Sequence, residues 1–108
     1  MASSKKEFGR VVLPKEFVES YTVEEGDKIA FGIRENCDNN LQGFLYQIFC
    51  TDDRPYGVAR IVGAEVTVDE KNRIYIPAVI RKNHTDEFVF VEEDERYFLY
   101  FFKLKSEQ

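Results

Sequence analysis

Two short stretches of this chain could place an arginine where a phosphate group would bind. Residues 9–17 read G-R-V-V-L-P-K-E-F, and residues 72–80 read N-R-I-Y-I-P-A-V-I. Arg10 and Arg73 are 63 residues apart, and each stands four residues before a proline. Arginine presents several N–H donors in a planar fork that matches phosphate oxygens. The spacing therefore predicts an internal repeat with one anion-binding arginine in each copy.

Basic residues gather around both copies, although the chain as a whole is acidic. Its 108 residues carry 15 Lys and Arg against 20 Asp and Glu, a formal charge of −5 at pH 7. Residues 1–15 and 54–82 each have a net charge of +3, whereas residues 16–53 and 83–108 have −7 and −4. The total excludes a protein that coats nucleic acid by bulk charge, but a local basic surface would still attract a phosphate backbone. The candidate DNA-contacting residues are Lys6, Arg10, Lys15, Lys71, Arg73, Arg81 and Lys82.

The two arginines also have a purely structural interpretation. Arg10 could pair with Glu7, and Arg73 with Asp69 or Glu70, to hold the turn that precedes each strand. Surface ion pairs of this kind contribute about 0–1 kcal/mol to stability. Both interpretations stay open on the sequence alone.

Other side chains capable of chemistry are sparse. Cys37, Cys50 and His84, the only histidine, show no C-x-x-C or H-x-x-x-H spacing, so we expect no metal site and no cofactor. We expect two reduced thiols, with a disulfide as the alternative, and His84 at a helix end without chemistry. Residues 92–95 are four consecutive acids, which at a hairpin tip indicate a solvated charge run rather than an acid–base pair. No nucleotide motif is present, and we therefore expect no catalytic residues and no enzymatic activity.

Each proline of the repeated stretch marks a change from strand to helix. Proline fits the first helical turn because its missing N–H would have no intrahelical partner there. Helices are therefore predicted from Pro14 to Tyr21 and from Pro77 to His84, and each must pack on a sheet because two turns are marginal alone. Strands are predicted at residues 10–13, 28–34, 41–50, 58–62, 64–69, 73–76, 88–91 and 96–104. Turns are predicted at residues 25–27, 69–73 and 92–95.

Length and composition indicate one domain with a single core. The chain is 44% hydrophobic and 32% charged, which is typical of globular proteins. We expect a single domain over residues 1–108, with a first repeat at 6–50, a linker at 51–57 and a second repeat at 58–105. No apolar run approaches the roughly 20 residues of a membrane span, and the first residues lack a signal-peptide pattern. We therefore expect a cytoplasmic protein without membrane contact.

A resemblance to a known family rests on both copies. The run G-R-V-V-L-P-K-E-F followed by E-E-G-D-K-I resembles the AbrB/MazE/SpoVT-type swapped-hairpin family. The second copy, V-D-E-K-N-R-I-Y-I-P-A-V-I-R-K, is similar to the tandem-repeat MraZ branch, where a D-x-x-x-R signature precedes the I-P step. Copy one departs from the pattern, with Lys6 in place of Asp and Glu19 in place of Arg, and copy two lacks the G-D turn.

This resemblance implies both a fold and a function. The implied fold is mostly β with two short helices, a swapped-hairpin AbrB-like β-barrel built from two β-α-β-β repeats in one chain. The implied function is a DNA-binding transcriptional regulator that contacts the DNA backbone through the basic strand-turn-helix corners of both repeats. The alternative is a protein-interaction module, antitoxin-like or an adaptor barrel, without strong DNA binding.

The aromatic run Y-F-L-Y-F-F at residues 97–102 is apolar on both faces of a predicted strand. Alternation would have left one face polar. Either the strand is buried on both sides, or one face is a self-association surface. That surface would consist of Tyr97, Leu99 and Phe101 or of Phe98, Tyr100 and Phe102.

Overall fold

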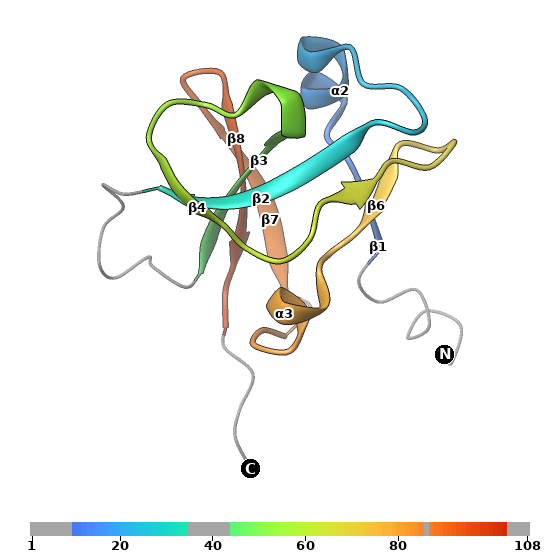
Figure 1. The fold of residues 1–108 in the computed structure, drawn as a ribbon. Coiled ribbons are helices and arrows are strands. Elements are labelled where there is room, and N and C mark those ends of the chain that lie inside the picture. Colours follow the sequence, from blue (N-terminus) through green and yellow to red (C-terminus); the bar gives the residue numbers. More distant parts are fainter. Residues whose placement is uncertain (1–9, 35–43, 86, 104–108) are drawn as a thin grey trace.

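The computed structural model describes residues 10–34, 44–85 and 87–103, which form many short strands and two short helices (Figure 1). The strands are β1 (Arg10–Val12), β2 (Lys28–Arg34), β3 (Leu45–Cys50), β4 (Val58–Ile61), β5 (Val66–Thr67), β6 (Arg73–Tyr75), β7 (Phe88–Glu93) and β8 (Arg96–Phe101). The helices are α2 (Lys15–Tyr21) and α3 (Ala78–Arg81), and Thr51–Asp53 forms one 3-10 turn, η1. The expected mostly β fold with two short helices is confirmed. None of the helices in the described ranges is long and apolar enough to cross a bilayer.

The strands form two antiparallel sheets. Five strands of the larger sheet follow the order β4-β2-β3-β8-β7, and β5 also pairs with β2. The hairpins β2–β3 and β7–β8 meet at its centre, where β3 pairs with β8. β1 and β6 form a second sheet of two strands, in which each pairs with the other.

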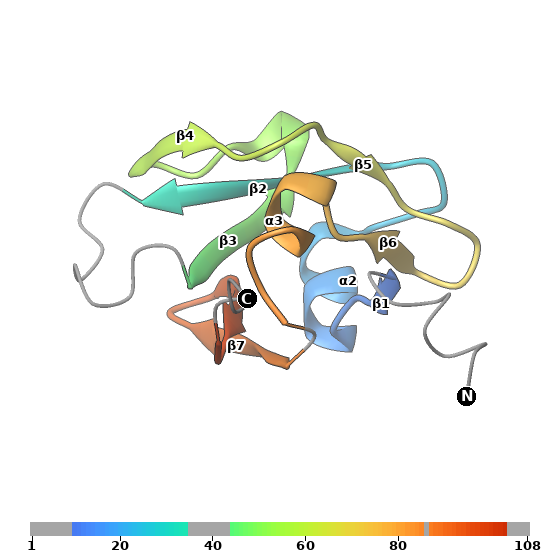
Figure 2. The same ribbon diagram turned by 90° about the horizontal axis from the view of Figure 1, so that it is seen from below.

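The expected closed barrel is wrong for the described part of the chain. A barrel requires every strand to have a neighbour on both sides. In the larger sheet, β7 pairs only with β8, and β4 pairs only with β2. β1 and β6, three residues each, pair with one another instead of bridging these two edges. The larger sheet is therefore open, and it curves around the helices (Figure 2).

The core lies on the concave side of the larger sheet. Figure 2 shows α2 and α3 inside the curve of the sheet, beside β1 and β6. Burying one large apolar side chain stabilises a protein by about 1.5–3 kcal/mol. The core therefore fixes the β1–β6 pair against both helices and the larger sheet. Its deeply buried side chains include Val11, Leu13, Phe17, Ile29, Phe31, Ile48, Ile74, Ile76, Ile80 and Leu99.

Both helices begin one residue later than predicted, directly after the prolines that were expected to be their first residues. Pro14 has φ −60° and ψ 142°, and Pro77 has φ −54° and ψ 143°, so each residue is extended and stands directly before a helix. α2 ends at Tyr21 as predicted, and α3 ends at Arg81, earlier than predicted. After α3 the chain turns so that the side chain of His84 enters the core.

The aromatic strand β8 lies between β3 and β7, and this place in the sheet explains its composition. Tyr97, Leu99 and Phe101 are buried in the core. The prediction of a self-association surface made of these three residues is therefore wrong, because their side chains are not accessible to a second molecule. On the other side of the strand Phe98 is also buried, whereas Phe102, just beyond the strand, is exposed. Self-association through Phe98, Tyr100 and Phe102 stays a prediction.

Candidate nucleic-acid interface

The β1–β6 pair carries the two arginines that the sequence singled out. Arg10 is opposite Tyr75, Val11 is opposite Ile74, and Val12 is opposite Arg73. Because side chains alternate between the two faces of a strand, the outer four residues of these pairs share one face. We call this face, made of Arg10, Val12, Arg73 and Tyr75, the ribbon face.

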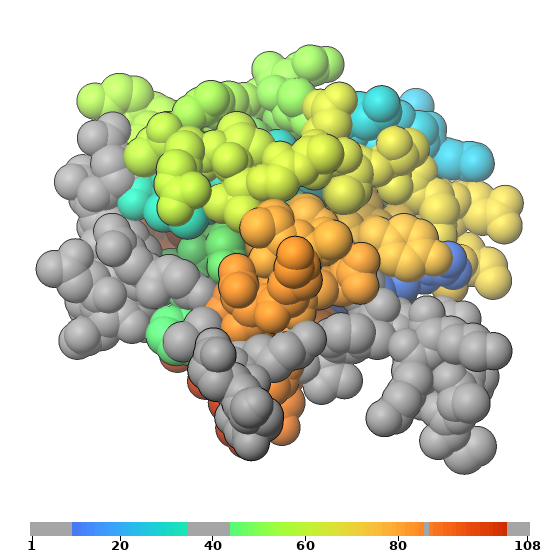
Figure 3. Space-filling view, turned by 60° about the horizontal axis from the view of Figure 1, so that its bottom comes forward, coloured from blue at the N-terminus to red at the C-terminus, as the bar shows by residue number. Residues whose placement is uncertain are grey.

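Burial shows which side of the pair faces solvent. Val11 and Ile74, the central pair, are 8% and 1% exposed and belong to the core. Val12 and Tyr75, on the other side, are 60% and 48% exposed. The ribbon face therefore points outward. Figure 3 shows α3 and β6 on one continuous face of the molecule, with β1 at its edge.

Arg10 is held on the ribbon face by its cross-strand neighbour. Its guanidinium carbon lies 4.6 Å from the centroid of the Tyr75 ring, and its Nη2 donates a hydrogen bond to the Tyr75 hydroxyl. A cation over an aromatic face is stabilised by about 0.5–1 kcal/mol at an exposed site. Tyr75 was not among the residues predicted from the sequence, although its alternation with Arg73 along one short strand places it on the same face.

Arg73 is held by the turn that precedes it. Oδ1 of Asp69 accepts hydrogen bonds from the backbone N–H groups of Lys71 (2.8 Å) and Arg73 (2.9 Å). Oδ2 of Asp69 accepts a bond of 2.9 Å from Nε of Arg73. Asn72 closes the turn with φ 59°, a left-handed conformation that asparagine tolerates. Arg73 therefore does pair with Asp69 and hold the turn. This bond uses Nε rather than the two terminal nitrogens of the guanidinium.

The same bonds change the titration of Asp69. Partial desolvation of the carboxyl opposes ionisation, but the hydrogen bonds from the Arg73 and Lys71 amides and the Arg73 guanidinium outweigh it. The pKa of Asp69 is therefore lowered below its usual value. The carboxylate stays charged at neutral pH and neutralises part of the charge of Arg73.

Four of the other candidate residues lie at the two ends of the β1–β6 pair. Leu13 donates its N–H to the carbonyl of Asn72 at 2.8 Å, so the start of α2 with Lys15 lies at the same end as Lys71 and Arg73. Because the strands are antiparallel, α3 begins at the other end, where Arg10 lies.

Arg81 and Lys82 close the second end of the pair. Nε of Arg81 donates to the carbonyl of Ile76 at 2.9 Å, which fixes the side chain beside the end of β6. Lys15, Lys71 and Lys82 are exposed. Lys6 lies outside the described residues, as does Glu7, the partner proposed for Arg10.

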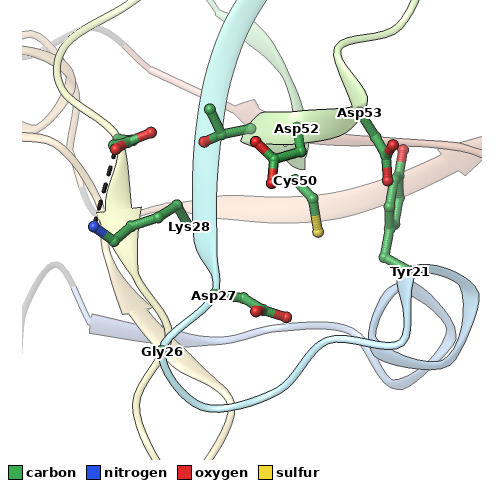
Figure 4. A pocket seen from close by; sticks show the side chains of 9 residues that line it. Tyr21, Gly26, Asp27, Lys28, Cys50, Asp52 and Asp53 are labelled. Atoms are coloured by element: carbon green, nitrogen blue, oxygen red, sulfur yellow. Dashed lines mark ion pairs between the residues drawn. The ribbon is translucent and has the colours of Figure 1, made fainter.

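A separate acidic cleft lies between α2, β2 and η1 (Figure 4). Its volume is about 530 Å³. The Lys28 ammonium is 4.0 Å from the Glu65 carboxylate on one side. Sequence reasoning missed this cleft, because its acids come from three different segments. The residues that line it include Tyr21, Asp27, Lys28, Cys50, Asp52, Asp53 and Glu65.

The cleft makes Cys50 a poor nucleophile. Burial and the neighbouring carboxylates of Asp27, Asp53 and Asp52 raise the pKa of the Cys50 thiol to about 11. The thiolate is the reactive form of cysteine, so the thiol of Cys50 is almost unreactive near neutral pH. Cys50 is a free thiol in the structure. Cys37, its proposed disulfide partner, lies outside the described residues.

His84 is a core residue. Its Nε2 is 2.9 Å from the hydroxyl of Tyr46, its Nδ1 is 3.2 Å from the carbonyl oxygen of Lys103, and its ring stacks on Phe101. A carbonyl only accepts, so Nδ1 carries the proton, and in the neutral ring Nε2 then accepts from the hydroxyl of Tyr46. Within the described ranges, no three His, Cys, Asp or Glu side chains are arranged to hold a metal ion.

Comparison of the chain with family models, curated proteins and solved structures finds no match.

Proposed function

We propose that this protein binds double-stranded DNA through the ribbon face and acts as a transcriptional regulator of the AbrB-like type. The observation that carries the proposal is the register of β1 and β6, which puts Arg10 and Arg73 on one exposed face. Diagonal neighbours of an antiparallel pair have side-chain origins about 7–8 Å apart. Because the two side chains start this close together, their guanidinium groups can contact phosphates of one DNA backbone.

Electrostatics favour this face over the others. Four lysines and arginines flank the ribbon face, Lys15 and Lys71 at one end and Arg81 and Lys82 at the other. Among the described residues, the acids at the Lys71 end of the pair include Asp69, which is already bonded to Arg73, its neighbour Glu70, and Glu16 in the first turn of α2. Each phosphate contact lowers the slope of log K against log salt by about 0.9, so five or six contacts would give a slope near −5. Because the rest of the chain is acidic, the affinity is weak and falls steeply with salt.

The proposal includes a duplicated architecture of two β-α-β-β units. The pairing of β1 with β6 supports it, because the register is symmetric. When each residue is replaced by its counterpart 63 positions away in the other strand, Arg10–Tyr75 becomes Arg73–Val12, and Val11–Ile74 stays at the centre. The nearly equal dihedral angles of Pro14 and Pro77 support it as well. In this interpretation the hairpin β2–β3 of the first unit corresponds to β7–β8 of the second. A pseudo-twofold axis passes through the β1–β6 pair and relates the two units, which brings both basic corners together.

Fluorescence anisotropy with a labelled duplex from the region upstream of the gene tests the function. The protein should bind at about 50 mM salt and lose affinity steeply by about 200 mM. Arg10→Gln and Arg73→Gln should each weaken binding; glutamine at position 73 can still donate to Asp69. Arg96→Gln, at an exposed position of the β7–β8 hairpin in the other sheet, is the matched control. Absence of binding by the wild-type protein at about 50 mM salt would refute the proposal.

A further inference from the structure

Within the described ranges, the outer edge of β7 is a free edge of the larger sheet. Among the described strands β7 pairs with β8 alone. The N–H of Phe102 bonds to the carbonyl of Glu87 at 3.0 Å. Because hydrogen-bonded and non-bonded pairs alternate along an antiparallel ladder, odd-numbered residues of β7 direct their backbone groups to β8. The N–H and C=O groups of Phe88, Phe90 and Glu92 therefore point to the free edge.

An apolar strip accompanies this edge on the convex face of the sheet. Val89 and Val91 are 41% and 37% exposed, and they stand opposite Tyr100 and Phe98 of β8. Phe102 is 51% exposed and packs edge-on against Tyr100, with ring centroids 5.5 Å apart. An added strand that alternates apolar and polar residues could cover this strip with one of its faces.

The charges at the ends of β7 determine which kind of strand could pair with its free edge. Residues 92–95 are four exposed acids at one end, and Glu87 stands at the other, where Lys103 approaches it at 3.5 Å. A second copy of β7 paired in antiparallel register would bring acids opposite acids, which is destabilising. A segment with basic residues at its ends would instead be complementary in charge.

We propose that the edge of β7 binds an extended, cationic peptide segment of a protein partner by strand addition. The peptide backbone would pair with the outward groups of Phe88, Phe90 and Glu92. Its apolar side chains would lie beside Val89 and Val91, and its basic ends would lie beside the acids. In strand addition the backbone bonds give affinity, and the side chains on alternating faces give specificity. This surface uses other strands than the ribbon face, so the inference does not depend on DNA binding.

Titration with a defined peptide tests the charge requirement. The probe is a fluorescein-labelled nine-residue peptide of alternating valine and threonine with two lysines at each end. It should bind saturably, and the same peptide with glutamate in place of lysine should bind at least about tenfold more weakly. The double variant Glu92→Lys/Glu93→Lys should also weaken binding of the lysine peptide by about tenfold. Glu25→Lys, in an exposed turn far along the chain from β7, is the control and should change little.

Hydrogen exchange tests the backbone pairing. The bound peptide should slow exchange of the amide protons of Phe88 and Phe90, whereas those of Val89 and Val91 already face β8 and should change little. A peptide methylated on the nitrogens that face β7 should not bind. No binding of the lysine peptide, equal binding of the glutamate peptide, or unchanged exchange at Phe88 and Phe90 would each overturn the proposal. Protection at these two amides that rises with protein concentration alone would assign the edge to a second copy instead, and would overturn it as well.

Discussion

Arg10 and Arg73 lie diagonally across the β1–β6 pair, with Arg10 opposite Tyr75 and Arg73 opposite Val12. Each is held by a different device: Arg10 by the ring and hydroxyl of Tyr75, and Arg73 by the carboxylate of Asp69. Both devices fix the direction of the guanidinium before a ligand arrives. Less side-chain entropy is then lost on binding.

Asp69 should make the free energy of unfolding depend on pH in the acidic range. Its folded-state pKa is lowered, so its contribution is complete above the unfolded value of about 3.9 and is lost as pH falls through the folded pKa. Urea unfolding of the wild type and of Asp69→Asn should therefore give free energies that differ most above about pH 4 and converge at lower pH. Glu70→Gln, an exposed neighbour outside the hydrogen bonds described for this turn, is the control. A difference that stays constant from acid to neutral pH would contradict the assignment.

The hydroxyl of Tyr46 should be important for stability through its bond to His84. Tyr46→Phe removes the hydroxyl that bonds to Nε2 of a fully buried ring. Loss of a hydrogen-bond partner of a buried polar group costs about 1–3 kcal/mol. Chemical denaturation should show a loss of that size. The half-buried Tyr100 offers the matched change, Tyr100→Phe, and an equal loss there would show that the bond to His84 is not the cause.

Cys50 should resist alkylation. With a pKa of about 11, its thiolate fraction at pH 8 is roughly 10⁻³, far below that of an ordinary cysteine with a pKa near 8.5. Peptide mapping after iodoacetamide treatment at pH 8 should find Cys50 modified at least about 100-fold more slowly than a cysteine in a short peptide. The rate should rise as pH approaches 11. Rapid modification at pH 8 would show that the acids and burial around the thiol do not act as described.

Replacing Gly63 should lower the free energy of unfolding for a steric reason that does not apply to Gly26. Both have positive φ, 72° and 95°, which costs an alanine about 1–2 kcal/mol. A Cβ on Gly63 would also lie 2.9 Å from Cβ of Pro77 and 3.1 Å from Cγ1 of Val79, whereas a Cβ on Gly26 would meet nothing within 4 Å. Gly63→Ala should therefore lower the free energy of unfolding by about 1–3 kcal/mol more than Gly26→Ala. Equal losses in thermal or urea unfolding would rule out close packing of this loop on the start of α3.

The local features of this fold were predictable because short-range chemistry sets them. Proline fixed both helix starts, and Asp69 with Arg73 set the turn between β5 and β6. The contacts between distant segments were not predictable in the same way. The stacking of Arg10 on Tyr75 joins residues 65 apart, and the burial of His84 depends on Tyr46 and Phe101. A closed barrel was expected from the resemblance alone, and this prediction was wrong. The sequence of a three-residue strand such as β1 does not specify which sheet edge the strand joins.

The most direct test of the central claim is an NMR titration of the isotope-labelled protein with duplex DNA. Binding through the ribbon face predicts that the largest amide shift changes fall on Arg10, Val12, Lys71, Arg73 and Tyr75, and that they disappear in the Arg10→Gln/Arg73→Gln double variant. Residues of β7 and β8 should change little. Shift changes confined to β7 and β8, or none at a salt concentration of about 50 mM, would contradict the account.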